Sequence, residues 1–299
     1  WLLTPGPLTT SRTVKEAMLH DWGSRDAEFI KLNARVRERL VELAGGQGTH
    51  VCVPLQGSGT FIVEAMIGTL VPRAGKLAVL VNGAYGTRMV RMCDYLGRDR
   101  VVLETPEDTP ADPAALDAAL AADAAITHVV VVQCETTSGV LNPVEEIAAV
   151  TARRGRRLLV DAMSAFGALP LDAAVTPYDA LVASSNKCLE GVPGVGFAII
   201  RRSALEAAKG NAPSLSFDLH DQWAAMEKTR QWRFTPPTHV LAALDQALAE
   251  HAAEGGVAGR GARYANNCRI LVEGLRALGF ETLLPDALQA PIIVTVRMP

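Results

Sequence analysis

Two polar residues in the middle of the chain have types and a spacing suited to chemistry on a bound cofactor. Lys187 follows the apolar run 180–183 among serines and glycines, and Asp161 ends another apolar run. Desolvation lowers the pKa of a buried lysine, and the neutral amine can condense with an aldehyde. An aspartate and a lysine at successive strand ends suit pyridoxal phosphate, with Asp161 on the pyridinium nitrogen and Lys187 on the aldehyde carbon. Taken alone, Lys187 is equally consistent with a surface lysine in a loop.

A turn that could bind an anion follows the predicted strand 49–55. The turn, Gln-Gly-Ser-Gly-Thr at 56–60, runs directly into an apolar helix. Backbone N–H groups of such a turn point at a phosphate, and the hydroxyls of Ser58 and Thr60 add donors. Ile62 stands where a dinucleotide fingerprint has its third glycine, and the Gly-Lys-Ser/Thr of a Walker loop is absent. The pattern predicts a phosphate cradle, with a helix N-cap flanked by loop glycines as the alternative.

Two further polar residues follow predicted strands. Tyr85 lies between two glycines after the strand 77–81, where its ring can lie flat against a planar ligand or merely close a turn. Thr136 lies in the polar loop after 128–132, a fully apolar strand typical of a parallel sheet covered on both faces.

The order of elements predicts the fold class. Strands alternate with helices up to Ile200, which indicates an α/β fold with a mainly parallel sheet sandwiched by helices. Ligands of such sheets bind beyond the carboxyl ends of the strands. One shared site is therefore predicted for the residues found there: Ser58, Tyr85, Thr136, Asp161 and Lys187.

Composition excludes several classes of function. The chain has 299 residues, 49% of them hydrophobic, and a net charge of −3. This length allows one large domain and a smaller one, and the lack of a basic bias argues against nucleic acid as a partner. The five cysteines form no CxxC pair, which fits the reducing cytoplasm, and the histidines show no HxH or HExxH spacing, so no metal site is expected. No apolar run is long enough for a membrane span.

The pattern changes after Ala204. Helices are predicted from Thr238 to Ala253 and from 260 to 278, followed by strands at 281–284 and 292–296. We predict an N-terminal arm (1–15), a large domain that binds the cofactor (16–237), and a connecting helix with the start of a small α+β domain (238–299). Because the sequence begins without Met and stops after a strand-like run, we expect both natural ends to be missing.

Seven stretches across nearly the whole chain resemble the fold type I pyridoxal phosphate enzymes, in the aminotransferase branch that contains the alanine–glyoxylate and serine–pyruvate transaminases. They are Leu-Thr-Pro-Gly-Pro (3–7), Gln-Gly-Ser-Gly-Thr (56–60), Asn-Gly-Ala-Tyr-Gly (82–86), Glu-Thr-Thr-Ser-Gly (135–139), Val-Asp-Ala-Met-Ser (160–164), Ser-Ser-Asn-Lys-Cys (184–188) and Trp-Arg-Phe-Thr-Pro-Pro-Thr (232–238). The last two are most similar to enzymes that act on 2-aminoethylphosphonate and pyruvate. The resemblance implies pyridoxal 5'-phosphate as cofactor and phosphonoacetaldehyde and L-alanine as products, in phosphonate catabolism.

The resemblance also implies a role for each matched residue. Lys187 would bind the cofactor and later move a proton, and Asp161 would pair with the ring nitrogen. Tyr85 would stack on the ring, and Thr136 would contact its hydroxyl.

The phosphate would be held by Ser58, Gly59, Thr60 and Asn186. Trp232 and Thr235 match a turn with which the partner subunit completes the phosphate site, so a homodimer with shared active sites is expected. The family's arginine for the substrate anion lies beyond Pro299.

Three other functions remain open at this point. The first is an alanine–glyoxylate or serine–pyruvate aminotransferase of the same branch. The second is a lyase of the same fold that resembles cysteine desulfurases, which needs a mobile nucleophilic cysteine, whereas Cys188 is expected to point away from Lys187. The third is an α/β binding protein without enzymatic activity.

Overall fold

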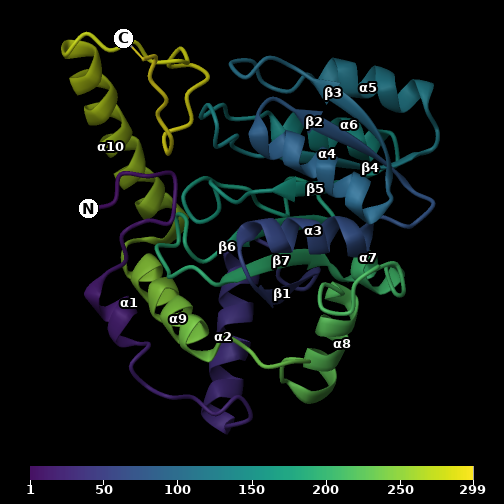
Figure 1. The fold of residues 1–299 in the computed structure, drawn as a ribbon, viewed down its shortest axis with the longest axis vertical. Coiled ribbons are helices and arrows are strands. Elements are labelled where there is room, and N and C mark those ends of the chain that lie inside the picture. The colour runs from purple at the N-terminus through teal and green to yellow at the C-terminus, as the bar shows by residue number, and fades with distance from the viewer. Residues whose placement is uncertain (299) are drawn as a thin grey trace.

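The computed structural model describes residues 1–298, and its centre is a seven-stranded sheet of order β1-β7-β6-β5-β4-β2-β3 (Figure 1). The strands are β1 (His50–Gln56), β2 (Lys76–Val81), β3 (Asp99–Glu104), β4 (Ile126–Val132), β5 (Arg157–Asp161), β6 (Ala180–Ser184) and β7 (Val195–Arg201). The strands β2 to β6 are mutually parallel, whereas β7 runs antiparallel to both β1 and β6. The predicted mainly parallel sheet is thereby confirmed.

Helices cover both faces of this sheet, as its apolar strands require. The helices are α1 (Arg12–Glu16), α2 (Ala27–Leu43), α3 (Gly59–Leu70), α4 (Ala84–Leu96), α5 (Pro113–Ala122), α6 (Val144–Arg153), α7 (Arg202–Ala207), α8 (Leu219–Thr229), α9 (Thr238–Ala253) and α10 (Gly256–Ala277). Side chains of α2, α5, α6 and α9 share one core cluster with the sheet, and those of α3, α4, α7 and α8 share the other. The α/β sandwich predicted from the alternation of elements is confirmed.

Local sequence explains where individual helices begin. Asp112 accepts a hydrogen bond of 2.8 Å from the Ala114 amide at the start of α5, where Pro113 occupies the first helical position.

In α2, Phe29, Leu32, Val36 and Leu40 are all buried, as their helical spacing predicts.

The C-terminal segment differs from the prediction. Strands were expected at 281–284 and 292–296, but the described residues there form only an isolated bridge between Thr282 and Val296. A lone pair of strands with no third strand beside it is marginal, which explains why no ladder forms. The helix α10 also begins earlier than predicted, at Gly256. The proposed domain boundaries stay a prediction.

Candidate active site

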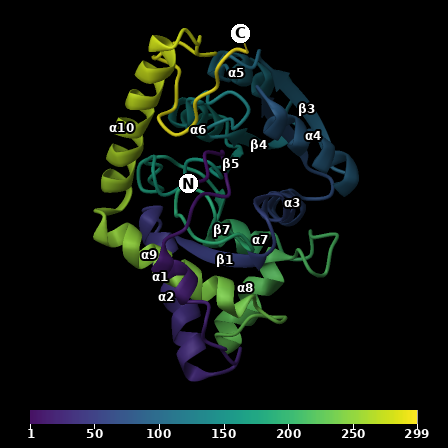
Figure 2. The ribbon, with the colours of Figure 1, turned by 60° about the vertical axis from the view of Figure 1, so that its left-hand side comes forward.

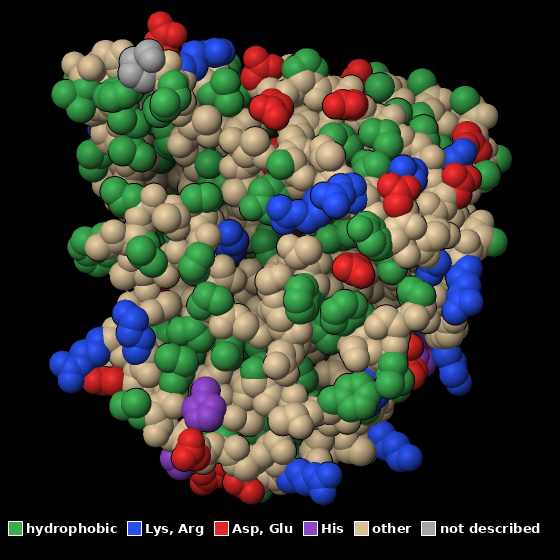
Figure 3. Space-filling view, viewed as in Figure 1, with side chains coloured by type: hydrophobic (Ala, Val, Ile, Leu, Met, Phe, Trp, Pro, Cys, Tyr) green, Lys and Arg blue, Asp and Glu red, His purple; other side chains and the backbone are tan. Residues whose placement is uncertain are grey.

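Seven of the ten predicted site residues line one cavity of about 480 Å³ beyond the carboxyl ends of the strands: Ser58, Gly59, Thr60, Tyr85, Asp161, Asn186 and Lys187. The basic residues that line it are Lys187 and Arg88. Basic side chains gather around the hollowed middle of this face of the molecule (Figure 3). Four of the five predicted strand-end residues therefore share one cavity, whereas Thr136 lies outside it.

Asp161 forms the floor of this cavity at the last position of β5, where it is 3% exposed. Its Oδ1 accepts a hydrogen bond of 2.9 Å from the Met163 amide. Burial raises the pKa of Asp161 to about 6, although that amide acts in the opposite direction. A carboxylate buried in this way is stabilised by a cation beside it, and a protonated ring nitrogen of a ligand in the cavity would supply that cation.

Lys187 lies in a tight turn just after β6. The Glu190 amide donates to the Lys187 carbonyl (2.7 Å), and the Gly191 amide donates to the Ser185 carbonyl (2.8 Å). A Cβ on Gly191 would lie 2.9 Å from that Ser185 oxygen, so the turn favours glycine there. Burial lowers the pKa of the Lys187 amine. More of the amine is therefore neutral and nucleophilic than in an exposed lysine.

The turn before α3 offers donors that the protein itself leaves free. Ser58 is the N-cap residue, but its side chain makes no capping hydrogen bond. The first N–H groups of a helix have no partner within the helix. The hydroxyl of Ser184, which lines the same cavity, is buried and has no hydrogen-bond partner among residues 1–298. A helix cap would use the N–H groups, but here they and the Ser184 hydroxyl remain available to bind the anionic group of a ligand in the cavity.

Arg88, one helical turn after Tyr85, is a site residue that the sequence reasoning missed. Its Nη1 donates to Thr60 Oγ1 (3.2 Å), and its guanidinium lies 4.6 Å from the centroid of the Tyr85 ring. It is a cation directly beside the predicted phosphate position. The spacing of three residues, which places Tyr85 and Arg88 on one helix face, is the signal that could have found it.

Glu135 is a second residue that the sequence reasoning missed. It is fully buried and accepts hydrogen bonds from the amides of Tyr85 and Gly86 (3.4 Å each) and from the Thr137 hydroxyl (2.8 Å). A carboxylate is favourable at a helix N-terminus. Glu135 therefore fixes the first turn of α4, which carries Tyr85 into the cavity.

The three remaining predicted residues lie outside this cavity. The hydroxyl of Thr136 is 2.5 Å from that of Ser164. Trp232 and Thr235 line a separate cavity of about 410 Å³, which shares Gly57 and Phe61 with the first one. Trp232 donates to Asn33 of α2 (2.9 Å). The roles predicted for Thr136, Trp232 and Thr235 stay predictions.

Arg260 ties α10 to the turn that carries Lys187. It is 2% exposed, and its Nε lies 2.6 Å from Glu254 while its Nη1 lies 3.6 Å from Glu190. The same Nη1 donates to the Cys188 carbonyl (2.5 Å). Breaking such a buried pair would leave an uncompensated charge, so the tie is strong.

Cys188, the neighbour of Lys187, does not resemble a mobile nucleophile. Its thiol donates to the Ser164 carbonyl (3.1 Å), and burial raises its pKa to about 12. A thiol held in this way is rarely ionised near neutral pH. The geometry therefore disfavours the alternative of a lyase that resembles cysteine desulfurases.

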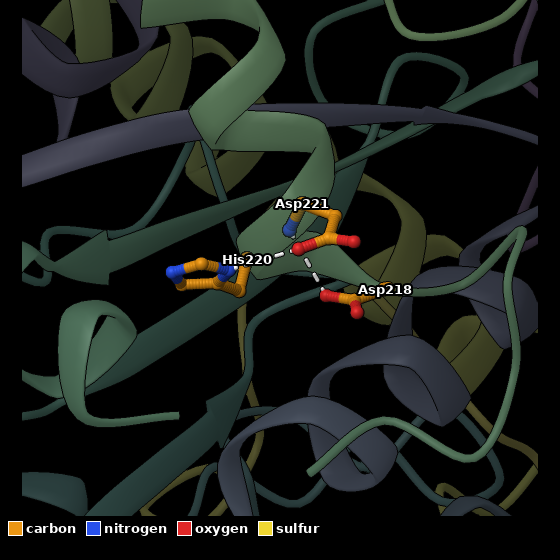
Figure 4. A group of neighbouring side chains, drawn as sticks. All are labelled: Asp218, His220 and Asp221. Atoms are coloured by element: carbon orange, nitrogen blue, oxygen red, sulfur yellow. Dashed lines mark hydrogen bonds and ion pairs between the residues drawn. The ribbon is translucent and has the colours of Figure 1, made fainter. Parts of the chain in front are cut away.

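A group with the residue types of a metal site lies at the start of α8, where ligand atoms of Asp218, His220 and Asp221 are within 4.8 Å of one another (Figure 4). Contacts within the protein explain why these side chains lie together. Asp218 accepts from the Asp221 amide (3.0 Å) as an N-cap, and Asp221 lies 3.3 Å from Arg233. The Arg233 guanidinium would repel a cation placed there, so the group is a helix cap with an ion pair.

Comparison with known proteins identifies similar chains. Residues 16–299 match the family model described as aminotransferase class-V. A curated relative from Burkholderia lata, named 2-aminoethylphosphonate–pyruvate transaminase 2, is 58% identical over 298 residues. That alignment covers the whole of this chain and 79% of the relative.

Solved structures share the fold. A pyridoxamine–pyruvate aminotransferase from Mesorhizobium loti has a TM-score of 0.91 at 26% identity, covering 99% of this chain and 76% of that one. An alanine–glyoxylate aminotransferase from Nostoc sp. also has a TM-score of 0.91, at 24% identity, covering 99% of this chain and 79% of that one. The α/β architecture is thus that of known aminotransferases.

Proposed function

The chain belongs to the aminotransferase class-V family. From its similarity to a curated relative we infer that it is a 2-aminoethylphosphonate–pyruvate transaminase. The observation that carries the substrate assignment is the 58% identity over 298 residues to a relative of that name. The products are phosphonoacetaldehyde and L-alanine. The alanine–glyoxylate alternative is not favoured, because its structural neighbour at 24% identity shares only the fold.

We propose pyridoxal 5'-phosphate as the cofactor, because the cavity offers a complementary group for each part of it. The buried Asp161 carboxylate would hold the protonated ring nitrogen, and Tyr85 would cover the ring. The donors of residues 58–60, with Asn186 and Arg88, would hold the phosphate. When bound, the cofactor supplies an electron sink that makes the hydrogen on the amine-bearing carbon acidic.

Lys187 carries the proton transfer. Burial lowers the pKa of its amine, so the neutral form is available to bind the cofactor's aldehyde carbon. When the substrate amine occupies the cofactor in its place, the free Nζ would accept the proton from the carbon that bears the amino group. General acid–base transfer of this kind is efficient when the pKa of the base lies near the working pH.

Asp161 supports that transfer from the opposite end of the ring. Its carboxylate has little water around it at 3% exposure, so a cation in the cavity would be its main electrostatic partner. By keeping the ring nitrogen of the cofactor protonated, Asp161 would maintain the acidity of the carbon on which Lys187 acts.

We also propose a homodimer in which Trp232 and Thr235 complete the phosphate site of the partner. The proposal rests on the match of Trp232 and Thr235 to the turn with which a partner subunit completes the phosphate site in the enzymes that this chain resembles. In this chain the two residues line a cavity that shares Gly57 and Phe61 with the cavity of Lys187. The proposed compartment is the cytoplasm, because all five cysteines are free thiols. No helix among residues 1–298 is long and apolar enough to cross a membrane.

Amine-donor competition tests the function. The purified chain loaded with pyridoxal phosphate is incubated with pyruvate and either 2-aminoethylphosphonate, serine or alanine, and the keto and aldehyde products are measured. Phosphonoacetaldehyde and alanine are expected from the first donor, with a shift in the visible absorbance when that donor is added. Activity with serine and none with 2-aminoethylphosphonate would contradict the assignment.

A further inference from the structure

The Pro-Gly-Pro segment, defined here as residues 4–8, lies directly against the amine of Lys187. Lys187 Nζ donates a hydrogen bond of 2.9 Å to the Pro5 carbonyl, and the Leu8 amide donates to the Asn186 carbonyl (3.2 Å). In Figure 2 the purple N-terminal chain lies in front of the central strands, near β5 and β7. Residues far apart in sequence thus meet at the residue that carries the chemistry.

Gly6 makes this close approach possible. Its φ is +131°, a conformation that side chains rarely adopt. A Cβ built on it would lie 2.6 Å from Cδ and 2.9 Å from Cε of Lys187, and closer still to Nζ. Because the end of a lysine side chain is flexible, a side chain at position 6 would displace the amine from its place.

The Pro-Gly-Pro segment also has its own internal bonds. Thr4 Oγ1 accepts from the Gly6 amide (3.3 Å) and donates to the Pro7 carbonyl (3.1 Å). Pro5 and Pro7 have restricted φ angles and no N–H group. The direction of the Pro5 carbonyl is therefore set by the segment itself and not only by its contact with Lys187.

We propose that the Pro-Gly-Pro segment is a positioning element of the active site: the Pro5 carbonyl holds the Lys187 amine whenever that amine is not bound to the cofactor, and Gly6 leaves the space for it. The inference rests on the proposed function, in which Lys187 is released and rebound in each turnover. A held amine stays next to the substrate carbon, whereas a free one would sample many rotamers.

Reductive methylation with formaldehyde and cyanoborohydride tests the contact in the full chain without cofactor. The rate at Lys187 is read by peptide mass spectrometry at the same alkaline pH for every variant. Gly6→Ala is expected to raise that rate about tenfold, the equivalent of one lost hydrogen bond to a lysine amine. The rates at the other lysines should not change.

Two further variants make the result decisive. Gly210→Ala is the matched control, because Gly210 has φ +80° but nothing within 4 Å of a built Cβ, and it should label like the wild type. Leu8→Pro removes the amide that bonds Asn186 without adding bulk at position 6, and it should raise labelling in the same direction as Gly6→Ala. Wild-type labelling in both Gly6→Ala and Leu8→Pro would overturn the proposal.

The loaded enzyme gives a second measurement. Gly6→Ala should lower kcat about tenfold while the Kd of pyridoxine 5'-phosphate, which lacks the aldehyde that Lys187 binds, stays at the wild-type value, since the phosphate cradle is untouched. A Kd of this analogue that weakens in parallel with kcat would instead indicate general damage to the site and contradict a positioning role. Because labelling needs no substrate, its outcome is independent of whether the transaminase assignment holds.

Discussion

The floor and the rim of the active-site cavity differ in how they bring polar groups to a ligand. On the floor, Asp161 is buried and Lys187 half-buried, and desolvation raises the pKa of the acid and lowers that of the amine. On the rim, Ser58 and Arg88 are exposed and lie in or next to the first turns of helices. The comparison predicts that changes on the floor lower the rate of reaction, whereas changes on the rim weaken cofactor binding.

The largest expected effect is at Lys187. Lys187→Ala should lower kcat about 10⁴-fold, the upper end of what a positioned acid–base group contributes. The variant should still bind pyridoxal phosphate through the rim, as measured by equilibrium dialysis. Turnover at the wild-type rate would remove Lys187 from the mechanism.

The next largest effect is expected at Asp161. Asp161→Asn should lower kcat about 10²-fold, because a neutral amide cannot keep the ring nitrogen protonated in a poorly hydrated site. Steady-state kinetics at saturating cofactor separates this loss from weakened binding. If kcat is unchanged once cofactor is saturating, the floor has no electrostatic role.

Without a ligand in the cavity, the buried Asp161 carboxylate should also lower the free energy of unfolding. The pKa of Asp161 rises from 3.8 to about 6 on folding, so the folded chain binds the proton more tightly and loses that advantage as pH rises through 6. Asp161→Asn does not ionise, and its gain in unfolding free energy over the wild type should therefore grow by about 2.4 kcal/mol between about pH 4 and about pH 7.5.

Urea denaturation of both chains without cofactor at the two pH values measures this difference. Asp108→Asn, at an exposed loop position, is the control and should show no such pH dependence. A difference between Asp161→Asn and the wild type that does not vary with pH would show that Asp161 is not ionising in a buried site.

The smallest effect is expected at the rim. Arg88→Gln should weaken pyridoxal phosphate binding by about tenfold, the value of one charge-assisted hydrogen bond, with kcat at saturating cofactor nearly unchanged. Arg91→Gln, an exposed arginine on the same helix, is the matched control and should bind like the wild type. A loss in kcat without a loss in affinity at Arg88 would reverse the division between rim and floor.

Much of the site could be predicted because parallel strands all end at one edge of the sheet. Asp161 ends one unambiguous apolar strand and Lys187 follows another, and β5 pairs with β6 in parallel, so the two residues line the same cavity. Arg88 and Glu135 escaped prediction for different reasons. Arg88 is one of several charges on an amphipathic helix, and Glu135 acts through backbone amides, which leave no pattern in side-chain types.

The C-terminal segment could not be predicted from local pattern. The runs 281–284 and 292–296 have the composition of strands, but a strand needs partners, and one bridge between Thr282 and Val296 is all that the described residues form there. The contacts of the Pro-Gly-Pro segment could not be predicted from the sequence either, because only the tertiary structure brings Gly6 to Lys187. Local propensity thus predicted elements well and long-range contacts poorly.

The buried guanidinium of Arg260 connects the long helix α10 to the turn that holds Lys187. A rotation of α10 would carry Arg260 with it, and the Cys188 carbonyl and Glu190 would follow through their bonds. A chain packed onto the outer end of that helix would therefore act on the turn that holds Lys187, the base proposed for the proton transfer.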